Sequence, residues 1–163
     1  GSPMIYYGAE AGMWGADDPD NRKPMVWPDL VYDNETSPYH SGISYTVEFD
    51  HDLFNYHKKL ISIRKQSQAI KCGSFKPIYL NHPNNRILCY ERQFEADKAL
   101  IILNASGKSA FVELDFLDGE WKDEITGQLF QAANTAIPRK SMPKIRLSLD
   151  SYSGVILRKV SSN

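Results

Sequence analysis

The sequence predicts a mainly β protein, in which an antiparallel β-sandwich or barrel-like domain follows a single strand, a long loop and a helix. Three observations predict this order. Residues 4–8 (MIYYG) form a short apolar run, residues 48–68 repeat apolar side chains with a helical period, and from about residue 74 onward the period changes to two. The 163 residues, 42% hydrophobic and 24% charged, have the composition of a globular protein with its own core.

The first element, residues 4–8, is predicted to be a strand that is apolar on both faces, as in parallel sheets covered on both sides. No segment near it supplies the neighbouring strands of such a sheet. An orphan strand leaves unpaired backbone groups at its edges, which favours pairing with another chain. We therefore expect self-association through residues 4–8, or poor order before about residue 48.

The second element is a long irregular loop whose most polar part is GADDPDNRKPMVW, residues 15–27. Its Asx-Pro and Pro/Gly content is typical of a plain chain of turns. It also suits a polar clamp, because Asp18 and Arg22 are four residues apart and a carboxylate beside a guanidinium both accepts from and donates to sugar hydroxyls. Trp14 and Trp27 flank the segment, and aromatic faces suit the apolar face of a pyranose. The residues alone leave both interpretations open.

The third element is a helix over residues 48–68, because its apolar side chains recur three and four positions apart. Asp50 and Asp52 lie at its start, where carboxylates cap the first turn and favour the helix dipole. The residues of the apolar face are Leu53, Phe54, Tyr56, Leu60, Ile61 and Ile63.

The remaining elements are short strands separated by turns rich in Asn, Asp, Gly, Pro and Ser. Such closely spaced strands favour antiparallel pairing in a sandwich or barrel. The expected strands cover residues 85–93, 98–106, 109–117, 119–128, 144–151 and 154–160.

Composition and motifs exclude several classes of function. The net charge of −1 gives no electrostatic reason to expect nucleic acid or a membrane surface as a partner, and no apolar stretch is long enough to cross a bilayer. The histidines are scattered, and neither a nucleophile elbow nor a nucleotide-binding loop occurs, so we expect no metal and no cofactor. Cys72 and Cys89 fit buried free thiols, with a single bridge between them as the alternative.

Residues 1–27 resemble the end of the catalytic barrel of the α-amylase superfamily, glycoside hydrolase family 13, in its neopullulanase, cyclomaltodextrinase and α-glucosidase branch. The family pattern is G-x-P-x-I-Y-Y-G-x-E-x-G-M, followed by D-P-x-N-R and P-M-x-W. Ala9 stands where many members have Asp or Gln, and residues 53–75 resemble the last barrel helix. The matching positions are Gly1, Pro3, Ile5, Tyr6, Tyr7, Gly8, Glu10, Gly12, Met13, Asp18, Pro19, Asn21, Arg22, Pro24, Met25 and Trp27.

The resemblance implies two domains. Residues 1–70 would be the C-terminal end of a (β/α)8 barrel, with the eighth strand, a substrate loop and the last helix, and residues 71–163 would be the C-terminal β-sandwich domain. Because Gly1 and Pro3 match the pattern, we expect them to be native sequence rather than a tag remnant. The family's three catalytic carboxylates precede the eighth strand, so we expect no catalytic residue in this chain and no activity from it alone.

The implied function is that of a retaining glycoside hydrolase acting on α-glucosidic bonds of maltooligosaccharides, cyclodextrins, pullulan or starch. Asp18 and Arg22 match a pair that binds sugar hydroxyls on the non-reducing side of the cleavage point. Arg22 orienting Asp18 through an ion pair is an equal interpretation. No cofactor is implied, and a calcium ion of the parent enzyme would bind outside this chain.

A non-catalytic module, which stabilises the barrel or binds glycan itself, is the alternative function. It would need an exposed aromatic platform on the β domain, for which Trp121 and Tyr79 are the candidates, although burial is the plainer expectation for both. A partner-binding protein unrelated to glycans is the third class, and residues 1–27 argue against it.

Overall fold

The chain divides into two compact units, Gly1–Ile61 and Ser62–Asn163, with the point of division inside one helix. The sequence predicts a different boundary, between residues 70 and 71, where the end of a barrel would meet a β-sandwich domain. That boundary stays a prediction. No helix among the described residues is long and apolar enough to cross a membrane. The computed structural model describes residues 2–15, 17–36, 42–78, 80, 86–114, 117, 119–131 and 145–160.

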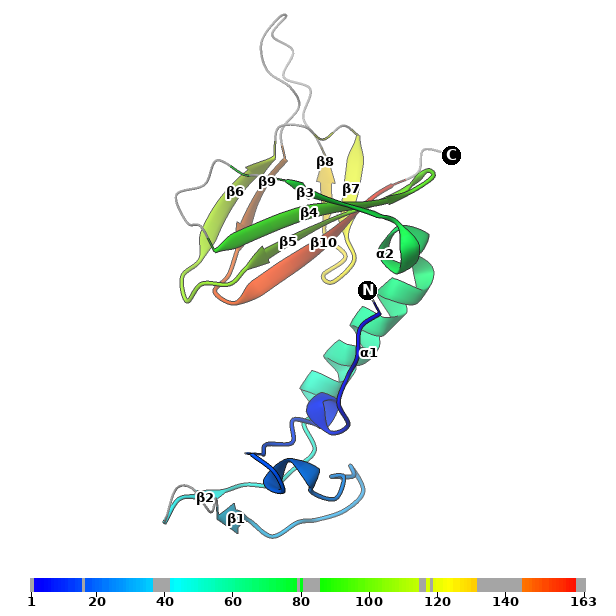
Figure 1. The fold of residues 1–163 in the computed structure, drawn as a ribbon. Coiled ribbons are helices and arrows are strands. Elements are labelled where there is room, and N and C mark those ends of the chain that lie inside the picture. The colour runs from blue at the N-terminus through cyan, green and yellow to red at the C-terminus, as the bar shows by residue number, and fades with distance from the viewer. Residues whose placement is uncertain are drawn as a thin grey trace, which may run out of the picture. The chain divides into compact units, whose positions relative to one another are not determined.

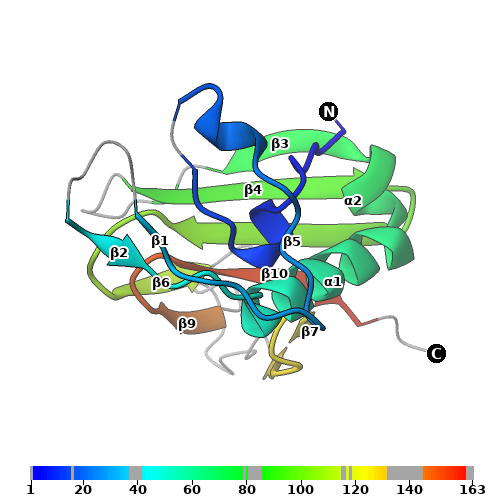
Figure 2. The same ribbon diagram turned by 90° about the horizontal axis from the view of Figure 1, so that it is seen from below.

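The second unit is built on a six-stranded antiparallel sheet with the order β3-β4-β5-β10-β7-β8. Figure 2 shows β3, β4, β5 and β10 running side by side. A two-stranded antiparallel sheet, β6-β9, accompanies it (Figure 1). The bounds are β3 Ser74–Ile78, β4 Ile87–Phe94, β5 Asp97–Asn104, β6 Ala110–Leu114, β7 Glu120–Asp123, β8 Leu129–Gln131, β9 Ile145–Leu149 and β10 Ser153–Lys159.

Side chains from both sheets form one core, which confirms the mainly β, antiparallel fold class. In β6 and β9 every second residue is buried, as the two-residue period of a strand with one covered face requires. Trp121 is 1% exposed and belongs to this core, so its burial is confirmed, whereas Tyr79 lies outside the described residues. The core residues are Cys89, Leu100, Ile102, Val112, Leu114, Leu117, Trp121, Ile145, Leu147, Leu149 and Leu157.

Helix α1, His51–Gln66, confirms the predicted helix and lies within its expected bounds. The Asp50 carboxylate accepts a hydrogen bond of 2.8 Å from the backbone N–H of Leu53, so it caps the helix as predicted. Ile63 is buried, but most of the expected apolar face stays partly or fully exposed. A second short helix, α2 (Gln68–Cys72), was not separated from α1 by the sequence pattern.

The cysteines differ in their surroundings. Both are free, but Cys89 is buried and Cys72 is exposed. The prediction of a buried thiol is therefore confirmed for Cys89 and wrong for Cys72. Cys72 is the last residue of α2, and this five-residue helix buries only Ala69, so the Cys72 thiol stays exposed.

The first unit contains two 3-10 turns and a short hairpin. Residues 4–8 do not form the expected strand, because no described segment pairs with them and a strand requires a hydrogen-bonded neighbour. Met4 and Ile5 are exposed instead, and Gly8 adopts a left-handed φ of 86° that turns the chain into η1. The elements are η1 Ala9–Ala11, η2 Asp20–Arg22, β1 Glu35–Thr36 and β2 Ser44–Tyr45, with β1 and β2 antiparallel.

Candidate functional site

The two predicted site residues lie together. Nε of Arg22 is 2.8 Å from Oδ1 of Asp18, and the two side chains are 69% and 57% exposed, respectively. An exposed ion pair contributes about 0–1 kcal/mol to stability, so folding gains little from it. Both charged groups remain accessible to a ligand, which fits the sugar clamp, and their contact fits the interpretation that Arg22 orients Asp18.

Local backbone structure brings the two side chains together. The turn η2 begins two residues after Asp18 and ends at Arg22, whose N–H donates to the Pro19 carbonyl at 3.0 Å. Gly15 lets the two sides of the loop approach, because a Cβ atom on it would lie 3.1 Å from the carbonyl oxygen of Asp20. Residues 17–22 therefore form a compact turn rather than an extended connection.

The chemistry of the pair suits neutral hydroxyl groups. A carboxylate is an acceptor only and a guanidinium is a donor only, so together they satisfy both hydrogen-bonding roles of adjacent hydroxyls. Hydrogen bonds to charged partners are also stronger than those between neutral groups. Binding of hydroxyl groups is therefore the chemistry that this pair offers.

The flanking tryptophans differ. Trp27 is exposed and lines a cavity of about 590 Å³, together with Tyr7, Glu10 and Phe54. Trp14 has the ammonium group of Lys23 3.2 Å from its ring centre and the ring of Tyr45 beside it. The ring of Trp14 is therefore engaged within the fold, whereas Trp27 remains available to a ligand or a neighbouring segment.

Glu10 has an unsatisfied carboxylate oxygen. Its Oε2 is buried and has no hydrogen-bond partner among the described residues, although Glu10 lines the cavity beside Tyr7. A buried carboxylate oxygen normally finds a donor. Glu10 is one of several polar residues, with His51 and Asn55, in a cavity lining that is otherwise mainly aromatic.

Metal ligation has no support in the described part of the chain, where no group of three or more His, Cys, Asp or Glu is placed to hold an ion. His57 lies within α1, where its Nδ1 is 2.9 Å from the Leu53 carbonyl oxygen. His40 and His82 lie outside the described residues.

The sequence did not reveal the residues outside the loop that contact it and stabilise its conformation. Lys23 contacts Glu35 at 2.6 Å, and its carbonyl accepts a hydrogen bond from the Tyr7 hydroxyl at 2.9 Å. Twelve and sixteen residues separate these partners, and no local pattern marks such pairs. Lys23 directly follows Arg22, and this adjacency was the one feature of the sequence that could have drawn attention to Lys23.

The comparisons with known families, sequences and structures agree with one another. Residues 79–156 match the family described as Maltogenic Amylase, C-terminal domain. A cyclomaltodextrinase from Thermoanaerobacter pseudethanolicus is 32% identical over 120 residues, which cover 74% of this chain and 17% of the relative. Neopullulanase 2 from Thermoactinomyces vulgaris is 27% identical over 160 residues, 96% of this chain and 23% of the relative. The crystal structure of a maltogenic amylase from S. marinus superimposes with a TM-score of 0.66 at 28% identity, over 99% of this chain and 18% of that one.

These matches confirm the resemblance drawn from residues 1–27: the chain is similar to the C-terminal part of glycoside hydrolases of the α-amylase family. The part that matches a family model, residues 79–156, is similar to the C-terminal domain of the maltogenic-amylase type. The chain spans about a fifth of the length of the relatives named above.

Proposed function

We propose that this chain is the C-terminal part of a retaining glycoside hydrolase that acts on α-glucosidic bonds of maltooligosaccharides, cyclodextrins, pullulan or starch. Relatives named cyclomaltodextrinase, neopullulanase and amylopullulanase support this substrate range. The exposed pair of Asp18 and Arg22, 2.8 Å apart, is the observation that carries the proposal into this chain.

In this proposal residues 1–70 complete a (β/α)8 barrel and residues 71–163 form its C-terminal β-sandwich domain. Residues 4–8 pair as a strand when the neighbouring strands of the barrel are present, and in their absence they pair with a second copy. Barrel active sites lie at the C-terminal ends of the strands, which is where a loop following residues 4–8 would lie. The loop thereby reaches the substrate.

Asp18 accepts and Arg22 donates hydrogen bonds to hydroxyls of a sugar on the non-reducing side of the cleaved bond. The bond itself is cleaved by carboxylates that precede this segment, through a covalent intermediate with the two principal carboxyl groups about 5 Å apart. Asp18 and Arg22 thus hold the sugar while groups outside this chain react with it.

The test uses the full-length enzyme with Asp18→Ala and Arg22→Ala. Each variant should lower kcat/KM for maltooligosaccharides by about ten- to a hundredfold, since it removes a charged hydrogen-bonding group from the bound substrate. Asp33→Ala, an exposed carboxylate of the same unit, is the matched control and should leave kcat/KM unchanged. Unchanged kcat/KM in both site variants, or hydrolysis by the 163-residue chain alone, would contradict the proposal.

A second candidate, a glycan-binding β module, has one observation in its favour. Phe75 is 60% exposed on β3, and its ring centre lies 5.1 Å from that of Tyr90 on β4. Such a pair can stack against a pyranose face. Isothermal titration of the 163-residue chain with maltooligosaccharides decides: heat of binding that disappears in Phe75→Ala but survives in Asp18→Ala would favour the module.

A further inference from the structure

Lys23 has three partners for one ammonium group. Its Nζ lies 2.6 Å from Oε2 of Glu35, 3.6 Å from Oδ1 of Asp20 and 3.2 Å from the centre of the Trp14 ring. The side chain is 17% exposed, so these contacts are screened by water far less than those of the neighbouring Arg22. A lysine with two carboxylates and an aromatic face is held in one place.

These contacts close a loop. Trp14 and Lys23 are the two ends of the segment that carries Asp18 and Arg22, and the cation–π contact joins those ends directly. The Trp14 ring also packs on Tyr45, with ring centres 4.9 Å apart. A compact loop whose ends meet is a common way to present functional side chains.

The base of the loop is fixed to the rest of the unit at two further points. Tyr45, which packs on Trp14, pairs with Glu35, which contacts Lys23, across the β1-β2 hairpin. Both ends of the loop therefore contact the same hairpin. The Tyr7 hydroxyl donates to the Lys23 carbonyl at 2.9 Å and thereby fixes the backbone one residue after Arg22. Three segments distant in sequence thus converge on Lys23.

The clamp pair does not hold itself in this way, because Asp18 and Arg22 are largely exposed and exposed pairs are weak. Preorganisation of a binding group improves affinity by removing the cost of ordering it in the complex. From this geometry we propose that Lys23 is the positioning residue of the sugar clamp: it fixes the loop that carries Asp18 and Arg22 and so sets the affinity for substrate without touching it. This inference rests on the proposed function.

The test compares four variants of the full-length enzyme on maltooligosaccharides. Lys23→Met keeps the apolar stem but removes the ammonium group; it should raise KM about five- to tenfold and change kcat less than about twofold. Lys23→Arg keeps both the charge and the cation–π contact and should restore KM to within about twofold of the wild type. Lys59→Met, an exposed lysine of α1, is the matched control and should leave both constants unchanged.

The fourth variant combines Lys23→Met with Asp18→Ala. If Lys23 acts through Asp18, adding Lys23→Met to Asp18→Ala should change KM less than about twofold relative to Asp18→Ala alone, because coupled sites are not additive. An unchanged KM in Lys23→Met, or an effect that multiplies fully with that of Asp18→Ala, would overturn the inference. If thermal unfolding shows that Lys23→Met is not folded, Glu35→Gln is used instead, because it removes the carboxylate partner of the same ion pair. An unchanged KM in Glu35→Gln overturns the inference equally.

Failure of the two proposals is distinguishable. A wild-type enzyme without activity on any of these glucans overturns the proposed function and this inference with it. An active wild type whose Lys23→Met variant keeps the wild-type KM overturns this inference alone.

Discussion

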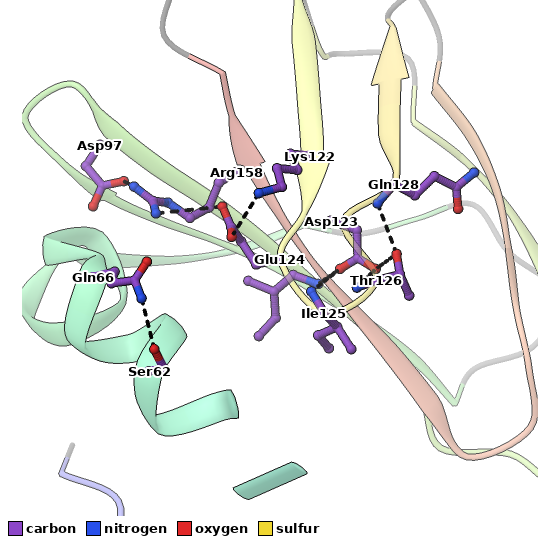
Figure 3. A network of polar contacts seen from close by, with 11 residues as sticks. Ser62, Gln66, Asp97, Lys122, Asp123, Glu124, Ile125, Thr126, Gln128 and Arg158 are labelled. Carbon is purple, nitrogen blue, oxygen red and sulfur yellow. Dashed lines mark hydrogen bonds and ion pairs between the residues drawn. The ribbon is translucent and has the colours of Figure 1, made fainter. Parts of the chain in front are cut away.

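The carboxylate of Asp97 accepts a hydrogen bond of 2.8 Å from the hydroxyl of Ser67, although 30 residues separate the two in sequence. The same carboxylate oxygen accepts from the backbone N–H of Ala69 at 2.9 Å, and Nη2 of Arg158 lies 3.2 Å from the other oxygen. Figure 3 shows the Asp97–Arg158 contact beside Glu124. Asp97 therefore ties the start of α2 to strands β5 and β10.

The first prediction concerns this carboxylate. Burial acts to raise the pKa of Asp97, but hydrogen bonds from Ala69 and Ser67 and the charge of Arg158 outweigh it, so the pKa lies below its ordinary value. A carboxyl group whose pKa is lowered by folding stabilises the fold above its unfolded-state pKa, and this stabilisation is lost as the pH falls through the lowered value. The loss therefore begins below about pH 4.

We expect Asp97→Asn to lower the free energy of unfolding at neutral pH by about 1–3 kcal/mol and to flatten its decline in acid. Urea denaturation over a pH series measures both effects. Asp150→Asn, an exposed carboxylate of the same unit, should behave as the wild type. An Asp97→Asn curve parallel to the wild-type curve in acid would refute the assigned cause.

The second prediction concerns Asp123, a buried carboxylate that closes the β7-β8 turn (Figure 3). It accepts hydrogen bonds from the backbone N–H groups of Ile125, Thr126 and Ile156 at 3.1, 3.1 and 3.2 Å, and from the Thr126 hydroxyl at 2.6 Å. Asp123→Ala leaves these donors without their acceptor and should cost about 3 kcal/mol or more. Thermal unfolding checks this, and a loss no larger than that of Asp150→Ala would show that the turn does not depend on the carboxylate.

The third prediction compares two leucines of the same sheet. Leu157 on β10 is fully buried, whereas Leu129 on β8 is 57% exposed. Leu157→Ala should lower the free energy of unfolding by about 2–5 kcal/mol, because it opens a cavity in the core. Leu129→Ala should cost less than about 1 kcal/mol. Denaturant unfolding of the pair checks the assignment of the core; equal losses would contradict it.

The fourth prediction concerns the thiols. Burial, and secondarily the negative charge of Glu91, raise the pKa of Cys89 to about 12, so this thiol stays protonated near neutral pH. At about pH 8, a maleimide should therefore label Cys72 in the folded protein and both cysteines only after unfolding. Mass spectrometry counts the labels. Cys72→Ser should take up none while folded, and a label on folded Cys72→Ser would disprove the burial of Cys89.

Much of the fold could be predicted from local patterns. Alternation marked β6 and β9 because one face of each strand is covered, and the helical period marked α1. β3 was missed because four of its five residues are exposed, so its sequence shows no alternation, and β8 was missed because three residues are too few to show a period. The strand expected at residues 4–8 is absent because a strand depends on its neighbour as much as on its own residues.

The sequence by itself determined the mainly β fold class and the family resemblance, which follow from period and motif, and it predicts Asp18 and Arg22 as a clamp from their spacing and their match to the motif. Tertiary structure alone decided what holds the clamp, because the contacts of Lys23 with Trp14, Glu35 and Tyr7 join segments that no local pattern relates. It also decided which of the two cysteines is buried. Contacts between distant segments depend on packing in three dimensions, and one-dimensional spacing does not record them.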